Sequence, residues 1–262
     1  MTDISITALF EDAHGQGAIG SDSKNLLSGM DLNDQLAQAM GIDVDTVNAT
    51  ELTLVTMVVD NSPSMEPMED EARQGHTLMI DALKGSKQSD GVLLGTWTFD
   101  DDPIGSYQPL SHVTTLNRTN YRADYPQGTP LFTATIKALG GVVAKTQQFS
   151  DNGQPTRSVT VIITDGANNG HRNTAQEVAT LVHDLEKQEM HVVIFIGIED
   201  SSWPVDFRQV AQEMGIRPDR VLTVNDGPHA LRAAIRMASQ SALAVSQAVG
   251  TVSQVGFGAV GV

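Results

Sequence analysis

Apolar runs without alternation of hydrophobic and polar positions recur along this chain. Residues 52–59, 158–164 and 191–197 are rich in β-branched side chains, and the first two runs end abruptly in polar residues. A strand covered on both faces of a parallel sheet has this pattern. We therefore expect three buried parallel strands, with polar loops at their carboxyl ends, where open α/β sheets bind ligands.

Helical periodicity fills the intervals between these runs. We expect helices from Met68 to near Gly85, from Pro130 to Phe149, after a capping box at Thr174 and Glu177, over residues 207–214, and from residue 231 to 249. Further strands are expected at residues 92–99, 104–110 and 221–224, the second of them an antiparallel edge after the turn at residues 100–103. This order predicts an α/β, three-layer Rossmann-like fold, with a mostly parallel central sheet, one antiparallel edge strand and helices on both faces.

The two ends of the chain have weaker patterns. The alternation of Ile4, Ile6 and Ala8 predicts a short strand, residues 15–30 are expected to be a loop, and the spacing of Leu32 and Leu36 predicts a short helix that stops at Gly41. Residues 111–128 are assigned no element. We expect an N-terminal extension at 1–50 whose helix packs on the main domain at 51–249. The glycine-rich tail at 250–262 either docks elsewhere or packs on the domain itself.

The charged residues of the chain limit the kinds of partner that it can bind. The 262 residues include 32 acidic and 16 basic side chains, for a net charge of −16, and no cysteine. This charge disfavours nucleic acid and anionic membranes, which require clustered Lys and Arg. The chain shows no signal peptide and no apolar run with the character of a membrane span. A cysteine-free chain suits any redox compartment, and the cytoplasm is the expected location.

Oxygen-bearing side chains gather where the first and second buried runs end. Asp60, Ser62 and Ser64 follow the first, Asp165 follows the second, and Thr129 precedes the helix at Pro130. Since parallel strands end at one edge of a sheet, we expect these five side chains to converge. Oxygen donors without His or Cys favour a hard cation, Mg²⁺ before Ca²⁺ or Mn²⁺, and not zinc. The alternative is that Asp60, Ser62 and Ser64 only cap the next helix.

These motifs resemble the von Willebrand factor type A (vWA) domain family, with its metal-ion-dependent adhesion site (MIDAS). The family pattern, Asp-x-Ser-x-Ser, a distant Thr and an Asp after a buried strand, is matched by Asp60-Asn61-Ser62-Pro63-Ser64, Thr129 and Asp165. The resemblance covers about residues 52–247. It implies that Ser62 and Ser64 bind Mg²⁺ through their hydroxyls, that some of the other three act through water, and that a partner's Glu or Asp completes the coordination.

The resemblance also guides the functional hypothesis. It implies a metal-dependent protein-interaction module in a multiprotein system, with an AAA-type ATPase or a stress-response assembly as a partner by analogy. The alternative is a metal-dependent phosphohydrolase, although no nucleophile-and-base pair accompanies the acidic loops.

Other groups are expected near the same rim. Asp100, Asp101, Asp102, Glu199 and Asp200 would repel an acidic partner in the absence of metal. The triple Asp is either a second cation site or a solvated turn, and Trp203 is either an exposed anchor or part of the core.

Overall fold

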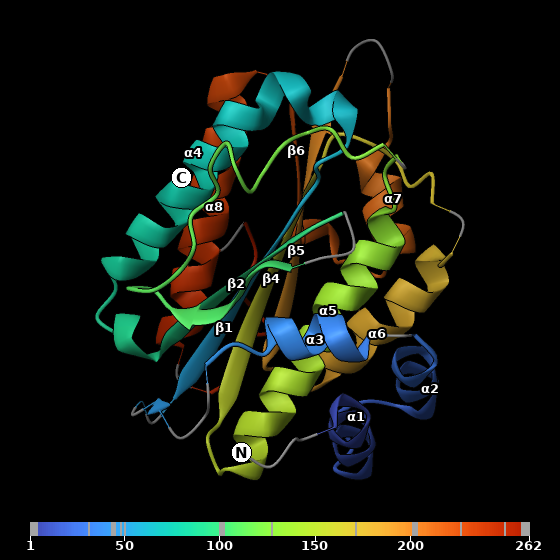
Figure 1. The fold of residues 1–262 in the computed structure, drawn as a ribbon, viewed down its shortest axis with the longest axis vertical. Helices are drawn as coiled ribbons and strands as arrows, with labels where there is room; N and C mark the ends of the chain where they lie inside the picture. The colour runs from blue at the N-terminus through green and yellow to red at the C-terminus, as the bar shows by residue number, and fades with distance from the viewer. Residues whose placement is uncertain are drawn as a thin grey trace.

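A six-stranded sheet runs through the middle of the molecule in the computed structural model (Figure 1), in the order β3-β2-β1-β4-β5-β6. The strands are β1 (Leu52–Val59), β2 (Val92–Thr98), β3 (Pro103–Pro109), β4 (Thr156–Thr164), β5 (His191–Glu199) and β6 (Val221–Asn225). All neighbours are parallel except β2 and β3, which are antiparallel. The expected α/β class, with its antiparallel edge strand, is confirmed.

The structure describes residues 5–30, 32–42, 46–47, 49, 51–99, 103–126, 128–170, 172–200, 204–225, 227–248 and 250–257. The expectations for Ile4, for the three aspartates at residues 100–102 and for Trp203 lie outside these ranges. In the described part of the chain, no helix has the length and apolar character needed to cross a membrane.

Strand register brings the polar loops together. Val59, the last residue of β1, lies beside Ile163 of β4 and Thr98 of β2. The strand β1 is buried along its whole length, which explains why its sequence does not alternate. Because β1 and β4 end at the same level, Asp60 and Asp165 emerge at one edge of the sheet.

Two helical layers cover the sheet (Figure 1). The helices α4 (Glu69–Lys84) and α8 (Pro228–Gln247) lie side by side on one face, and α5 (Leu131–Asp151), α6 (Ala175–Lys187) and α7 (Phe207–Glu213) cover the other. Short 3₁₀ turns are η2 (Pro63–Met68), η3 (Ser89–Gly91) and η4 (Pro218–Arg220). The predicted capping box of α6 is present, since Thr174 and Glu177 bond each other's backbone N–H groups.

The N-terminal segment differs from the sequence prediction. The expected strand at Ile6 and Ala8 is wrong, because both residues lie in α1 (Ile6–Gly15). The expected loop is found at residues 16–20, but the residues after it form a second helix, α2 (Ser21–Gly29). The short helix before Gly41 is confirmed as α3 (Asn33–Ala39). Ile6, Leu9, Phe10 and Ala13 form one buried helical face, so the three-residue alternation was too short to distinguish strand from helix.

The three N-terminal helices pack outside α5 and α6 and join the same core. The carboxylate of Asp184 on α6 accepts hydrogen bonds from the Gly20 N–H (2.7 Å) and the Ser23 hydroxyl (2.6 Å). This side of the sheet therefore carries an additional helical layer.

The start of the tail packs on the domain itself. The Val252 N–H donates to the Glu189 carbonyl at 2.7 Å, and the Arg217 guanidinium donates to the Ser253 carbonyl at 2.8 Å. Residues 250–257 thus lie against the amino-terminal end of the sheet, and the five residues after them lie outside the described ranges.

Candidate metal centre

Asp60 is held rigidly at the end of β1. Its carboxylate is fully buried; Oδ1 accepts the Ser62 N–H at 2.7 Å and Oδ2 accepts the Thr164 hydroxyl at 2.6 Å. Its own N–H donates to the Ile163 carbonyl at 2.9 Å, which extends the β1–β4 ladder by one residue. Neighbouring strands therefore fix both the backbone and the carboxylate of this residue.

The two serines link Asp60 to Asp165. The Ser62 and Ser64 hydroxyls lie 3.1 Å apart, and the Ser64 hydroxyl donates to Asp165 Oδ1 at 2.8 Å. The alternative that these residues only cap a helix is not observed, since Ser62, which precedes η2, makes no side-chain capping bond. Ser62 is buried and Ser64 is exposed, so the cluster opens to solvent on the side of Ser64.

Thr129 reaches the same cluster from a separate loop. Its N–H donates to Asn169 Oδ1 at 2.5 Å, and the Asn169 N–H donates back to the Thr129 carbonyl at 3.0 Å. Gly128 has φ +86°, and a Cβ there would lie 2.5 Å from Asn169 Oδ1, so this position requires glycine. A Cβ on Gly166 would lie 3.1 Å from the Thr129 hydroxyl. The structure thus brings all five predicted side chains to one edge of the sheet.

The electrostatics of the cluster are unbalanced. Burial raises the pKa of Asp60 to about 6, against hydrogen bonds from Ser62 and Thr164 that lower it, and the charge of Asp165 raises it further. Burial likewise raises the pKa of Asp165, and the nearby charge of Asp200 adds to the effect. Among the described residues, no salt bridge involves Asp60 or Asp165.

The donor chemistry suits a hard cation. In the described part of the chain, no group of three or more His, Cys, Asp or Glu side chains is placed to hold a metal. The cluster described above offers two carboxylates and three hydroxyls. Oxygen donors of this kind fit Mg²⁺, Mn²⁺ or Ca²⁺ rather than a metal that prefers soft ligands. The carboxylates also lack a compensating positive charge, which a divalent cation would supply.

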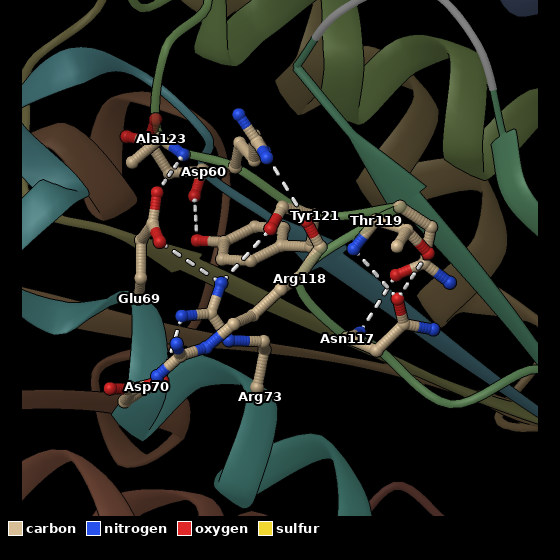
Figure 2. Close-up of polar contacts among 11 residues, drawn as sticks. Asp60, Glu69, Asp70, Arg73, Asn117, Arg118, Thr119, Tyr121 and Ala123 are labelled. Atoms are coloured by element: carbon tan, nitrogen blue, oxygen red, sulfur yellow. Dashed lines mark hydrogen bonds and ion pairs between the residues drawn. The ribbon is translucent and has the colours of Figure 1, made fainter.

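A second layer behind the site was missed in the sequence (Figure 2). The buried Tyr121 hydroxyl donates to the Asp60 carbonyl at 2.6 Å, and the Tyr121 carbonyl accepts from Arg73 at 3.0 Å. Arg73 also bonds Glu69, whose other oxygen accepts the Ala123 N–H at 2.7 Å. Tyr121 lies in the segment that received no predicted element; the signal was a lone aromatic residue within a polar stretch. Thr164 could have been recognised as the strand residue directly before Asp165.

The comparisons with known proteins found similarity in structure but not in sequence. No protein-family model matches the sequence, and neither does any curated protein. Proximal thread matrix protein 1 (PTMP1) from the mussel byssus is similar in structure, with a TM-score of 0.50 and 17% identity over 75% of this chain and 49% of that chain. The pilus adhesin SpaC from Lactobacillus rhamnosus GG has a TM-score of 0.49 and 15% identity over 75% of this chain and 30% of that chain.

A von Willebrand factor type A structure from Catenulispora acidiphila is a more distant match, with a TM-score of 0.38 and 13% identity over 74% of this chain and 43% of that chain. This chain therefore spans half or less of the length of each of these proteins. The sheet order, the helical layers and the similarity to the mussel protein confirm the three-layer α/β fold that the vWA resemblance implies.

Proposed function

We propose that this protein is a metal-dependent protein-interaction module that uses a MIDAS to bind an acidic residue of a partner. The observation that carries the proposal is a pair of carboxylates, the buried Asp60 and the partly buried Asp165, which share a cluster with serine hydroxyls and form no salt bridge among the described residues. A site of this kind favours a cation bound by oxygen atoms.

The cation that fits best is Mg²⁺, with Mn²⁺ and Ca²⁺ as alternatives. Ser62 and Ser64 would hold it through their hydroxyls, and Asp60, Thr129 and Asp165 directly or through water. When bound, such a cation supplies an electrophilic position for a carboxylate. PTMP1 is described with zinc occupying its MIDAS motif, and a divalent cation at the corresponding edge of this chain is part of our proposal.

The charge of the protein makes this interaction depend on metal. The chain carries a net charge of −16, and Asp200 acts electrostatically on Asp165 at the same rim. An acidic partner is repelled by this field unless a cation is present. We propose a protein partner that offers Glu or Asp, such as an AAA-type ATPase or a stress-response assembly in the cytoplasm.

The phosphohydrolase alternative has less support. The general base of such an enzyme would be expected beside the acidic cluster. Two buried histidines instead form hydrogen bonds with residues outside this cluster. The His76 ring bonds Thr96 and the Leu116 N–H, and the His191 ring bonds Ser158. Loss of phosphoester turnover in Asp60→Ala would favour the enzyme.

Metal binding by the purified protein is the first test. We expect Asp165→Ala and Ser62→Ala to weaken Mn²⁺ binding by about 10- to 100-fold in a titration followed by electron paramagnetic resonance. Glu213→Ala, an exposed carboxylate on α7, is the matched control and should bind Mn²⁺ as the wild type does. Equal affinity in all four proteins would contradict the site.

Partner binding is the second test. Proteins captured by the wild type in Mg²⁺ should be released by EDTA and should be absent from the Asp165→Ala sample. Retention of the same proteins in EDTA and by Asp165→Ala would show that the metal centre does not mediate the interaction.

A further inference from the structure

A positive groove lies between α4 and α8 on this strongly acidic protein. Its volume is about 540 Å³. The floor includes Leu78 and Ala233, and the other lining residues are Gln74, Thr77, His229, Arg232 and Arg236. Three of the seven lining side chains are therefore arginine or histidine, and none is acidic.

The arginines of this groove are not neutralised within the described structure. Arg232 donates to Gln74 Oε1 at 2.7 Å and lies 2.9 Å from His229 Nδ1, so neither of these partners is a carboxylate. No salt bridge among the described residues involves Arg232 or Arg236.

Five other arginines differ from this pair because they form ion pairs, whereas Arg122 and Arg208 form none among the described residues. Arg73, Arg157 and Arg220 each form an ion pair with a carboxylate of the same chain. The chain contains twice as many acidic as basic residues, so arginines that form no ion pair with a carboxylate leave local positive charge on a negative molecule.

The groove has an apolar element as well as charge. Leu78 is partly exposed and Ala233 is exposed, one on each helix. The helices pack closely because Gly75 leaves room for the Ile235 side chain, which a Cβ at that position would contact. A ligand that combines negative charge with small or branched apolar side chains would satisfy both parts of this surface.

We propose that this groove binds an acidic, partly apolar segment of a partner protein. The argument is charge complementarity, because guanidinium groups pair with carboxylates in a forked geometry and the field over the rest of the protein repels acidic chains. The groove adjoins the helix that follows the metal loop, yet the interaction needs no cation, so it goes beyond the proposed function.

The test uses a labelled helical peptide of glutamate, leucine and alanine, measured by fluorescence anisotropy in EDTA at low salt. We expect the wild type to bind it and the Arg232→Glu/Arg236→Glu variant to bind it at least about tenfold more weakly. The control Lys187→Glu/Arg208→Glu changes net charge equally, through exposed residues of α6 and α7, and should retain binding. A peptide with glutamine in place of glutamate should not bind.

A second variant separates shape from charge. Ala233→Trp fills the groove without altering net charge and should also weaken binding, and thermal unfolding will verify that each variant is folded. Asp165→Ala should bind the peptide as the wild type does, so failure of the metal site would be distinguishable from failure of the groove. Unchanged affinity in Arg232→Glu/Arg236→Glu, an equal loss in the charge-matched control, or a dimer in sedimentation that this variant dissociates would each overturn the proposal.

Discussion

Charged side chains have different kinds of partner at the two ends of the sheet. At the amino-terminal end, Arg220 is 1% exposed and forms an ion pair with Glu186. Its guanidinium also donates to the carbonyls of Val255 (2.9 Å) and Ser253 (3.0 Å). At the carboxyl-terminal end, Asp60 and Asp165 have only hydroxyl and N–H hydrogen-bond partners among the described residues.

The difference separates a structural ion pair from the proposed binding site. Burial raises the pKa of Glu186, but the positive charge of Arg220 opposes this shift. For Asp60, no positive side chain opposes the raised pKa. Only hydrogen bonds from Ser62 and Thr164 lower it. A buried carboxylate without a cationic partner is costly for the folded state, and it is retained at the end where ligands bind in this class of sheet.

The largest effect on stability is expected from Arg220→Met. The substitution leaves Glu186 without its cationic partner and removes two bonds to the tail, so we expect the free energy of unfolding to fall by about 3–5 kcal/mol in urea titrations. Arg217→Met is the control, since the Arg217 side chain is 44% exposed and an exposed ion pair contributes about 1 kcal/mol or less. The stabilisation gained from added Mg²⁺ should be the same in both variants, because the metal centre lies at the other end. A loss in Arg220→Met no larger than in Arg217→Met would remove the contrast between the two ends.

The next effect is a pH dependence from His76, a buried group that stays neutral. Burial lowers its pKa from 6.5 to about 4, and its Nδ1 accepts the Leu116 N–H at 3.3 Å. The unfolded chain therefore binds a proton that the folded chain does not, and the stabilisation present above pH 6.5 is lost as the pH falls toward 4. We expect this loss to be about 3 kcal/mol.

His76→Gln keeps a donor and an acceptor but cannot titrate. Urea unfolding at pH 7 and near pH 4 should show a smaller loss in this variant than in the wild type. His191, which is also buried with its pKa lowered to about 4, is unchanged in both proteins and cancels in the comparison. Identical losses would show that His76 is protonated in the folded state.

The smallest effect is expected from Tyr121→Phe, behind the metal loop. The substitution removes the hydroxyl that bonds the Asp60 carbonyl and should cost about 1 kcal/mol of stability. Mn²⁺ affinity should fall by less than about tenfold, because the five proposed ligand side chains are retained. A loss as large as that of Asp165→Ala would show that the Tyr121 hydrogen bond sets the position of the whole metal loop.

The site was predictable because its residues occur at the ends of strongly patterned strands. β1 and β4 are buried and rich in β-branched and apolar residues, and parallel strands end at one edge, so the sequence places Asp60 and Asp165 together. The hydroxyl of Thr129 reaches this edge only through the pairing of its loop with Asn169, and the sequence gives no rule for that pairing.

The N-terminal helices and Tyr121 were not predictable for a related reason. The buried face of α1 is decided by packing against α5 and α6, and the short alternation at its start fits either a strand or a helix. Tyr121 lies in an irregular segment whose position depends on Arg73, Glu69 and the Asp60 carbonyl. Irregular segments have no periodicity from which to infer their neighbours.

The sequence by itself determined the α/β class, the order of strands and helices from residue 52 onward and the five candidate ligands, because hydrophobic periodicity and strand-end chemistry are local properties. The tertiary structure alone decided which charged side chains form ion pairs and which do not. It placed Arg220 against Glu186, gave Asp60 and Asp165 only neutral hydrogen-bond partners among the described residues, and left Arg232 and Arg236 in a groove without a salt bridge among those residues. Charge compensation depends on distances between residues remote in the chain, and folding is what sets those distances.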